Sequence, residues 1–158
     1  MLNKLLILYI LAGNPEGQIP VEPQNYGVSS TKTLVQKSKW LVKPIITVCN
    51  TSGISKDRVE GAFQFWKNLG YEFETVYYAS RDNFSCAISE PPRYQIMIDI
   101  PSSDFPFNTH VGNTKTWSMG DNREIIKAKI EIVFGWGETS RILEHEIGHA
   151  LGWNDIPQ

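Results

Sequence analysis

The stretch from Arg141 to Asp155 reads R-I-L-E-H-E-I-G-H-A-L-G-W-N-D, and it carries more chemical information than any other part of the chain. His145 and His149 lie four residues apart, and Glu146 directly follows the first of them. On a helix, residues four apart share one face, so the two imidazoles would point at one ion. The remaining sequence makes most sense as a scaffold that holds this stretch.

Zinc is the ion that this pattern favours. Neutral imidazole is a good zinc ligand, and a catalytic zinc takes three protein ligands and leaves one position for water. Glu146 is rotated by about 100° from His145 on a helix, which places its carboxylate within reach of that water. We therefore expect Glu146 to act as the general base that takes a proton from a zinc-bound water and passes it to the leaving amine of a cleaved peptide.

A third ligand is expected just after the helix. Gly152 follows His149 by three residues, and glycine readily adopts the left-handed conformation that ends a helix and turns the chain back. Asp155 comes three residues later, and a carboxylate oxygen is a normal zinc ligand. The predicted zinc site is therefore His145, His149 and Asp155. The alternative, a surface helix with two incidental histidines, is disfavoured because the motif follows a predicted strand and lies on a predicted helix.

The motif His145-Glu146-Ile-Gly-His149-Ala-Leu-Gly152-Trp-Asn-Asp155 resembles that of the metzincin metallopeptidases, H-E-x-x-H-x-x-G-x-x-H/D. Its core, H-E-I-G-H-A-L-G, is similar to the matrixin version, and aspartate as third ligand resembles the snapalysin-type bacterial proteases. The resemblance implies a zincin-like α/β fold over residues 40–158. Its mixed, mostly parallel five-stranded sheet would have an edge strand that lines the substrate cleft. It also implies a zinc metalloendopeptidase with the ligands and the base named above.

Metzincins carry a Met-turn after the third ligand. The sequence ends at Gln158, and Met97 and Met119 lie upstream of the motif. We therefore expect the upper subdomain of the metzincin catalytic domain without the Met-turn region, as either a fragment of a longer protein or a reduced variant. Two alternatives stay open: a zinc-binding, protease-like domain with impaired catalysis, and a zinc amidase that acts on a small or cell-wall peptide.

The length of 158 residues suits one domain. Residues 1–13 hold one lysine followed by an apolar run that is too short to span a bilayer, so they are either a secretory signal peptide or a buried N-terminal strand. Residues 14–39 are rich in Pro, Gly, Gln, Ser and Thr, which predicts an irregular arm or linker.

Apolar periodicity predicts the elements of the domain. Strands are expected at 45–48, 71–79, 94–100 and 127–134, with a weaker edge strand within 109–117. An amphipathic helix is expected over 55–69, capped by Ser55 and ended by Gly70. The active-site helix would start at Thr139 or Ser140 and reach Leu151. The order strand, helix, strand favours a right-handed crossover in a mostly parallel sheet.

The formal net charge of −2 and the absence of a basic run argue against nucleic acid or an anionic membrane as a partner. We expect a protein or peptide substrate, a monomer and no stable membrane insertion. Cys49 and Cys86 either form one disulfide, as in an exported protein, or are two free thiols in a cytosolic one. A secreted or extracytoplasmic location is the expectation, with a cytoplasmic one as the alternative.

Four further residues need an interpretation. His110 falls in the expected edge strand, where a partly exposed histidine is the plainer hypothesis and a place beside the cleft is the alternative. Glu144 is expected to point to solvent. Asp99 and Asp104 lack the spacing of a calcium-binding loop, so no calcium site is predicted.

Overall fold

The computed structural model describes residues 36–80, 86, 90–121, 123–139 and 141–154. The predictions for residues 1–13, for residues 14–35 of the arm and for Asp155 lie outside the described residues.

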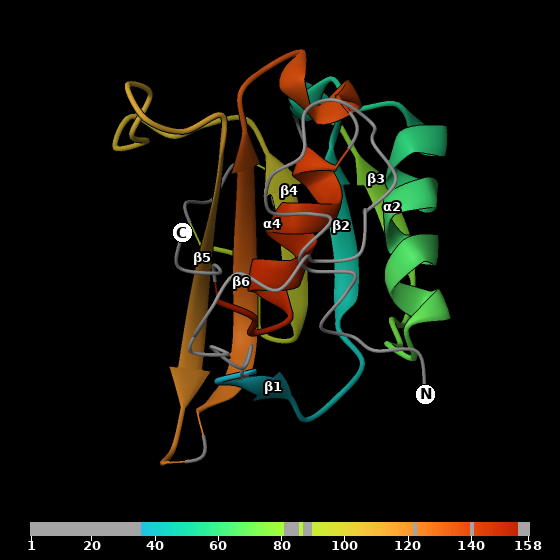
Figure 1. Ribbon diagram of the computed structural model, residues 1–158, viewed down its shortest axis with the longest axis vertical. Coiled ribbons are helices and arrows are strands. Elements are labelled where there is room, and N and C mark those ends of the chain that lie inside the picture. Colours follow the sequence, from blue (N-terminus) through green and yellow to red (C-terminus); the bar gives the residue numbers. More distant parts are fainter. Residues whose placement is uncertain (1–35, 81–85, 87–89, 122, 140, 155–158) are drawn as a thin grey trace, which may run out of the picture.

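The core of the fold is one mixed sheet of six strands (Figure 1). The strands are β1 (Lys39–Trp40), β2 (Ile45–Cys49), β3 (Val76–Ala79), β4 (Gln95–Asp99), β5 (Gly112–Met119) and β6 (Glu124–Ile132). Their order is β3, β2, β4, β6, β5, and β1 pairs with the beginning of β6. Every pairing is parallel except that of β5 with β6. The predicted α/β class with a mostly parallel sheet is confirmed, and the two-residue β1 brings the expected five strands to six.

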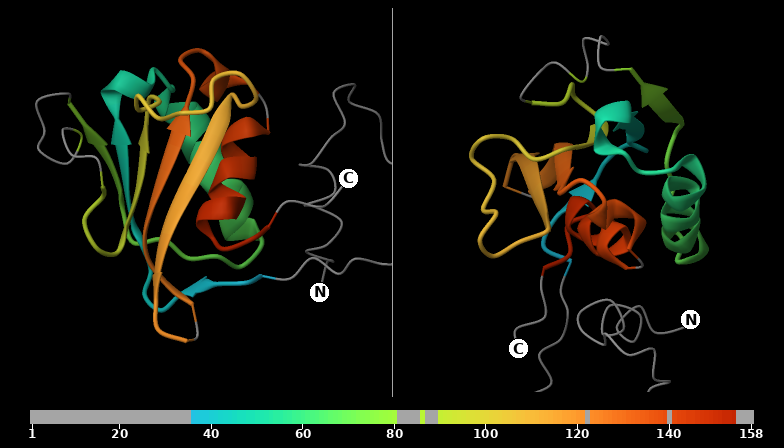
Figure 2. Two further views of the ribbon diagram at one scale, coloured as in Figure 1. Left: turned by 90° about the vertical axis from the view of Figure 1, so that its left-hand side faces the viewer. Right: turned by 90° about the horizontal axis from the view of Figure 1, so that it is seen from above.

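Two α-helices cover one face of this sheet (Figure 2). Helix α2 (Lys56–Asn68) begins after Ser55, whose hydroxyl accepts a hydrogen bond from the backbone N–H of Arg58, as the sequence predicts. Helix α4 (Ile142–Ala150) carries the two histidines and packs against α2, β5 and β6. The core between helices and sheet is apolar and includes Ile46, Val48, Val59, Phe63, Trp66, Ile96, Ile98, Ala128, Ile130, Ile132, Leu143 and Ile147.

The start of β3 differs from the prediction. Strand pairing begins at Val76 rather than Tyr71, because the segment before it is held by the helices. The backbone N–H of Tyr71 donates to the carbonyl of Trp66, and the Tyr71 hydroxyl accepts from the indole of Trp153 at 2.7 Å. Tyr71, which the alternating pattern placed in the strand, therefore contacts Trp66 of α2 and Trp153 after α4 instead of a neighbouring strand.

The start of α4 also differs. Thr139 was expected as a cap, but it ends the short 3-10 helix η2 (Trp136–Glu138), and its carbonyl oxygen accepts from Arg58. Arg141 precedes the helix with a left-handed φ of 79°, without a side-chain cap. Ser140, the other expected cap, lies outside the described residues.

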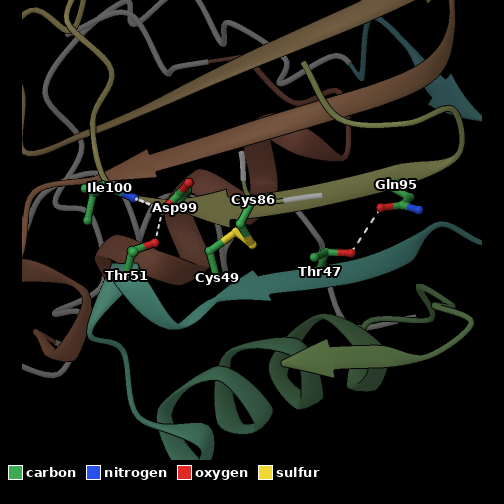
Figure 3. Close-up of a disulfide and its surroundings, with 7 residues drawn as sticks. All are labelled: Thr47, Cys49, Thr51, Cys86, Gln95, Asp99 and Ile100. Atoms are coloured by element: carbon green, nitrogen blue, oxygen red, sulfur yellow. Dashed lines mark hydrogen bonds between the residues drawn. A yellow bond between two sulfur atoms is a disulfide. The ribbon is translucent and has the colours of Figure 1, made fainter. Parts of the chain in front are cut away.

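The far face of the sheet is the side turned away from α2 and α4. Strand side chains alternate between faces, so Thr47, Cys49, Asp99 and Glu131 lie there while their strand neighbours enter the helix-side core. Cys49 forms a disulfide with Cys86 on this face (Figure 3). Of the two alternatives for the cysteines, the structure therefore has the disulfide.

Candidate metal and catalytic site

His145 and His149 lie one turn apart on α4 and face each other. Their Nε2 atoms are 3.0 Å apart, and their ring planes are almost perpendicular, at 89°. Two nitrogen ligands of a tetrahedral zinc, each about 2.0–2.1 Å from the ion, would be about 3.3 Å apart. The separation of the two Nε2 atoms therefore fits a shared zinc ion with little adjustment.

The second ring nitrogen of His149 fixes its tautomer. Nδ1 of His149 is 2.9 Å from the carbonyl oxygen of Trp153. A carbonyl oxygen only accepts hydrogen bonds, so Nδ1 carries a proton, and in a neutral imidazole the lone pair is then on Nε2, where a metal would bind. Trp153 is itself held by its indole bond to Tyr71 and by a backbone bond to Gly148. This second layer of contacts keeps the imidazole in the orientation that a metal ligand requires.

Glu146 is buried between α4 and the edge strand β5, with 6% of its surface exposed. The hydroxyl of Thr114 donates to Oε2 of Glu146 at 2.6 Å and lies 3.1 Å from the Glu146 carbonyl oxygen. A Cβ atom on Gly112 would lie 2.6 Å from Oε1 of Glu146. Thr114 of β5 thus positions one carboxylate oxygen, and Gly112 leaves room for the other, an arrangement that the sequence did not predict.

The turn after α4 follows the expected geometry as far as Asn154. Gly152 has a φ of 93°, which favours glycine, and a Cβ there would lie 2.1 Å from the carbonyl oxygen of Ser38. Asp155, the predicted third ligand, lies outside the described residues. Within the described ranges, no group of three His, Cys, Asp or Glu side chains is placed to hold a metal ion.

A cavity of about 330 Å³ opens beside these groups. Its lining is mostly polar and comes from the helix, the edge strand and both flanking segments: Ser38, His110, Gly112, Asn113, Thr114, Thr116, Glu146, His149, Gly152, Trp153 and Asn154. His110 is exposed, and its Nδ1 is 2.6 Å from the Thr109 hydroxyl. His110 was expected within the edge strand, but it precedes β5 by two residues and lines this cavity.

The described end of the N-terminal arm donates hydrogen bonds to backbone carbonyls at the C-terminal end of α4. The indole of Trp40 donates to the carbonyl of Ala150 at 2.8 Å, and the side-chain amide of Gln36 donates to that of Leu151 at 2.7 Å. The backbone N–H of Lys37 donates to the carbonyl of Gly152. Residues 36–39 were predicted as irregular, but they satisfy carbonyls that a helix end leaves open. The sequence does not predict these hydrogen bonds, because the arm and the end of α4 are more than a hundred residues apart in the chain.

Glu144 corrects an expectation. It was predicted to point to solvent, but its side chain is only 15% exposed and forms a two-point ion pair with Arg58 of α2. The carbonyl of Glu144 also accepts from the Trp66 indole at 2.9 Å. Glu144 therefore fixes α4 against α2.

Asp99 and Asp104 take part in hydrogen bonds within the protein. Asp99 accepts from the Thr51 hydroxyl at 2.5 Å and from the backbone N–H of Ile100 at 2.7 Å (Figure 3). Asp104 accepts from Lys115 and from Ser102, and chiefly the Lys115 hydrogen bond lowers the pKa of this carboxyl to about 2.

None of the described helices is long and apolar enough to cross a membrane. Comparison of the chain with protein-family models, with curated proteins and with solved structures finds no match.

Proposed function

We propose that the protein is a zinc-dependent metalloendopeptidase of the metzincin type. The observation that carries the proposal is the approach of the two Nε2 atoms of His145 and His149 to 3.0 Å, beside the buried carboxylate of Glu146. Two converging imidazoles, a poised carboxylate and an adjoining cavity are the parts that metal-assisted hydrolysis requires.

The donor set suits zinc. We infer that His145 and His149 hold the ion through Nε2 and that Asp155 completes the site. When bound, zinc would supply a Lewis acid that polarises the scissile carbonyl and makes an attacking water more acidic. Imidazole nitrogen is a ligand that zinc accepts readily, whereas calcium and magnesium favour oxygen.

Glu146 is the proposed general base. Its carboxylate lies on the turn of α4 that carries the ligands and accepts a hydrogen bond from Thr114 on one oxygen. In the proposed reaction it takes a proton from the attacking water and delivers it to the leaving amine. The buried position of Glu146 limits access of bulk water to this transfer.

The substrate proposed is a protein or peptide. Strand β5 pairs with β6 along one edge, and Gly112, Thr114 and Thr116 of β5 line the cavity beside Glu146. An extended peptide laid along this strand would place a backbone carbonyl next to the site. We also propose a secreted protein, since the Cys49–Cys86 disulfide fits an oxidising compartment, and a monomer stays the expectation.

The test compares the wild-type chain with Glu146→Gln, and with Glu146→Ala as a second variant. We expect the wild-type protein to bind one zinc per chain and to cleave a denatured protein substrate. Either variant should lose activity by about 10²–10⁴-fold, because the base is removed. Zinc analysis and thermal unfolding of the same samples show that the variants stay folded and loaded.

Equal cleavage by wild type and variants would contradict the proposal, and so would a protein that binds no zinc. Stoichiometric zinc without turnover would instead identify a non-catalytic, protease-like domain. Cleavage of small amides or cell-wall peptides alone would identify an amidase.

A further inference from the structure

Edge strand β5 presents one threonine to the candidate base. Thr114 is paired with Ile130 of β6, and cross-strand partners point to the same face of a sheet. Ile130 is fully buried in the core on the helix side. Thr114 therefore points toward α4, where its Oγ1 atom lies 2.6 Å from Oε2 of Glu146.

The contact is of the kind that fixes a carboxylate. A hydroxyl that donates to a charged oxygen forms a shorter and stronger hydrogen bond than a neutral pair does. Threonine is β-branched, so its side chain has few rotamers and aims its hydroxyl in a defined direction. The same Oγ1 atom lies 3.1 Å from the Glu146 carbonyl oxygen, so it contacts both the backbone and the side chain of this residue.

Gly112 leaves room for the other oxygen of this carboxylate. It precedes Thr114 by two residues, so both positions lie on the same face of β5. A Cβ at Gly112 would come within 2.6 Å of Oε1 and 2.9 Å of Cγ of Glu146. Oε2 thus contacts a hydroxyl, while Oε1 lies in space that the absent side chain of Gly112 leaves open.

We propose that Thr114 is a positioning residue that holds the Glu146 carboxylate in the orientation needed for proton transfer, and this rests on the function proposed above. A general base works only when its lone pair points at the proton it removes. Removing the hydroxyl takes away this contact from a side chain that has three rotatable bonds. A displacement of about 1 Å costs up to about 100-fold in rate.

The experiment uses the full zinc-loaded chain and four variants. Thr114→Val removes the hydroxyl at nearly constant volume, and Thr114→Ser keeps it. Glu146→Gln reports the loss of the base itself. The matched control is Thr47→Val, because Thr47 is another strand threonine whose hydroxyl donates to a side chain, in this case to Gln95 on the far face at 3.0 Å (Figure 3).

We expect Thr114→Val to lower kcat by about 10-fold to 100-fold, the usual effect of losing a partner that orients an active-site group. KM and the zinc content should stay near the wild-type values. Thr114→Ser should recover most of kcat, and Thr47→Val should keep it. If valine disturbs folding, Thr114→Ala replaces it in the comparison with serine.

Two results overturn the proposal while leaving the peptidase function intact. In the first, Thr114→Val has wild-type kcat although Glu146→Gln is inactive. In the second, serine fails to restore kcat or the valine variant loses zinc, which would make Thr114 a structural residue. A wild-type protein that binds zinc but cleaves nothing overturns both proposals, so the two failures are distinguishable.

Discussion

Two buried glutamates lie on opposite sides of the sheet, and different kinds of groups donate hydrogen bonds to their carboxylates. Glu131 is fully buried on the far face of β6, and Glu146 is nearly as buried on the helix side. Glu131 accepts from the ammonium of Lys129 at 3.0 Å and from the backbone N–H of Ser102 at 3.1 Å. Glu146 accepts from the neutral hydroxyl of Thr114 and lines a cavity.

The contacts of Glu131 are those of a structural carboxylate, whereas Glu146 is the base proposed above. Burial alone would raise the pKa of Glu131, but hydrogen bonds from Ser102 and Lys129 and the attraction of Lys129 and Lys115 lower it overall. Lys115 and Lys129 are register partners on β5 and β6, so Glu131 also offsets the repulsion between two neighbouring lysines. A carboxylate held in this way is a poor proton acceptor. Glu146, the proposed base, differs from it in accepting a hydrogen bond from the neutral hydroxyl of Thr114.

The largest effect is expected from Glu131→Gln. This change leaves Lys129 buried without its negative partner, and breaking a buried ion pair costs about 3–5 kcal/mol of stability. The kcat of the folded protein should stay near wild type, because Glu131 lies across the sheet from the cavity. Urea unfolding gives the stability, and peptide cleavage well below the unfolding temperature gives kcat.

The Glu146→Gln variant is the matched counterpart of Glu131→Gln. It should keep most of its stability and lose its activity. If both variants lost activity at unchanged stability, the two carboxylates would belong to one functional unit, and the contrast drawn between them would be wrong.

A somewhat smaller loss of stability is expected from opening the disulfide. Cys49 and Cys86 are 37 residues apart, and a crosslink of this kind stabilises a protein by about 2–4 kcal/mol by restricting the unfolded chain. The double variant Cys49→Ala/Cys86→Ala should therefore unfold at lower urea concentration. Its zinc content should match that of the wild type, since the bond lies on the far face. Loss of zinc at a temperature where the protein is still folded would show that the far face supports the site directly.

The smallest effect is a pH dependence of stability. The folded pKa of Glu131 lies below its ordinary value of 4.5, so its stabilising contribution is complete above that value and is lost as the pH falls through the folded pKa. One carboxylate changes the unfolding free energy by at most about 1.4 kcal/mol per pH unit. The stability difference between wild type and Glu131→Gln should shrink from pH 7 to pH 3 in urea titrations. A constant difference would mean that Glu131 is not held charged by its lysines.

The sequence predicted those parts of the fold that depend on local periodicity. The apolar face and the Ser55 cap of α2 were found because a helix repeats every 3.6 residues and its first N–H groups need acceptors. The β2, α2, β3 unit follows from the same patterns. The convergence of His145 and His149 was also predictable, since a spacing of four residues on a helix decides it.

Contacts between distant segments were not predictable in this way. The outward orientation expected for Glu144 was wrong because Arg58 lies opposite it on another helix. The start of β3 was misplaced because Tyr71 packs against Trp66 and bonds to Trp153. In both cases the sequence around a side chain suggests an exposed or a strand position. The side chain instead bonds to a residue that is far away in the chain.

The sequence by itself determined the chemistry of the candidate site: two imidazoles and a carboxylate on one helix, followed by a glycine turn. Helical spacing alone is sufficient for that arrangement. The tertiary structure decided how the carboxylate is held, because Thr114 and Gly112 reach Glu146 only when β5 pairs with β6 beside α4. It also decided that Glu131 is held by lysines, since their proximity depends on the register of two strands rather than on any local pattern.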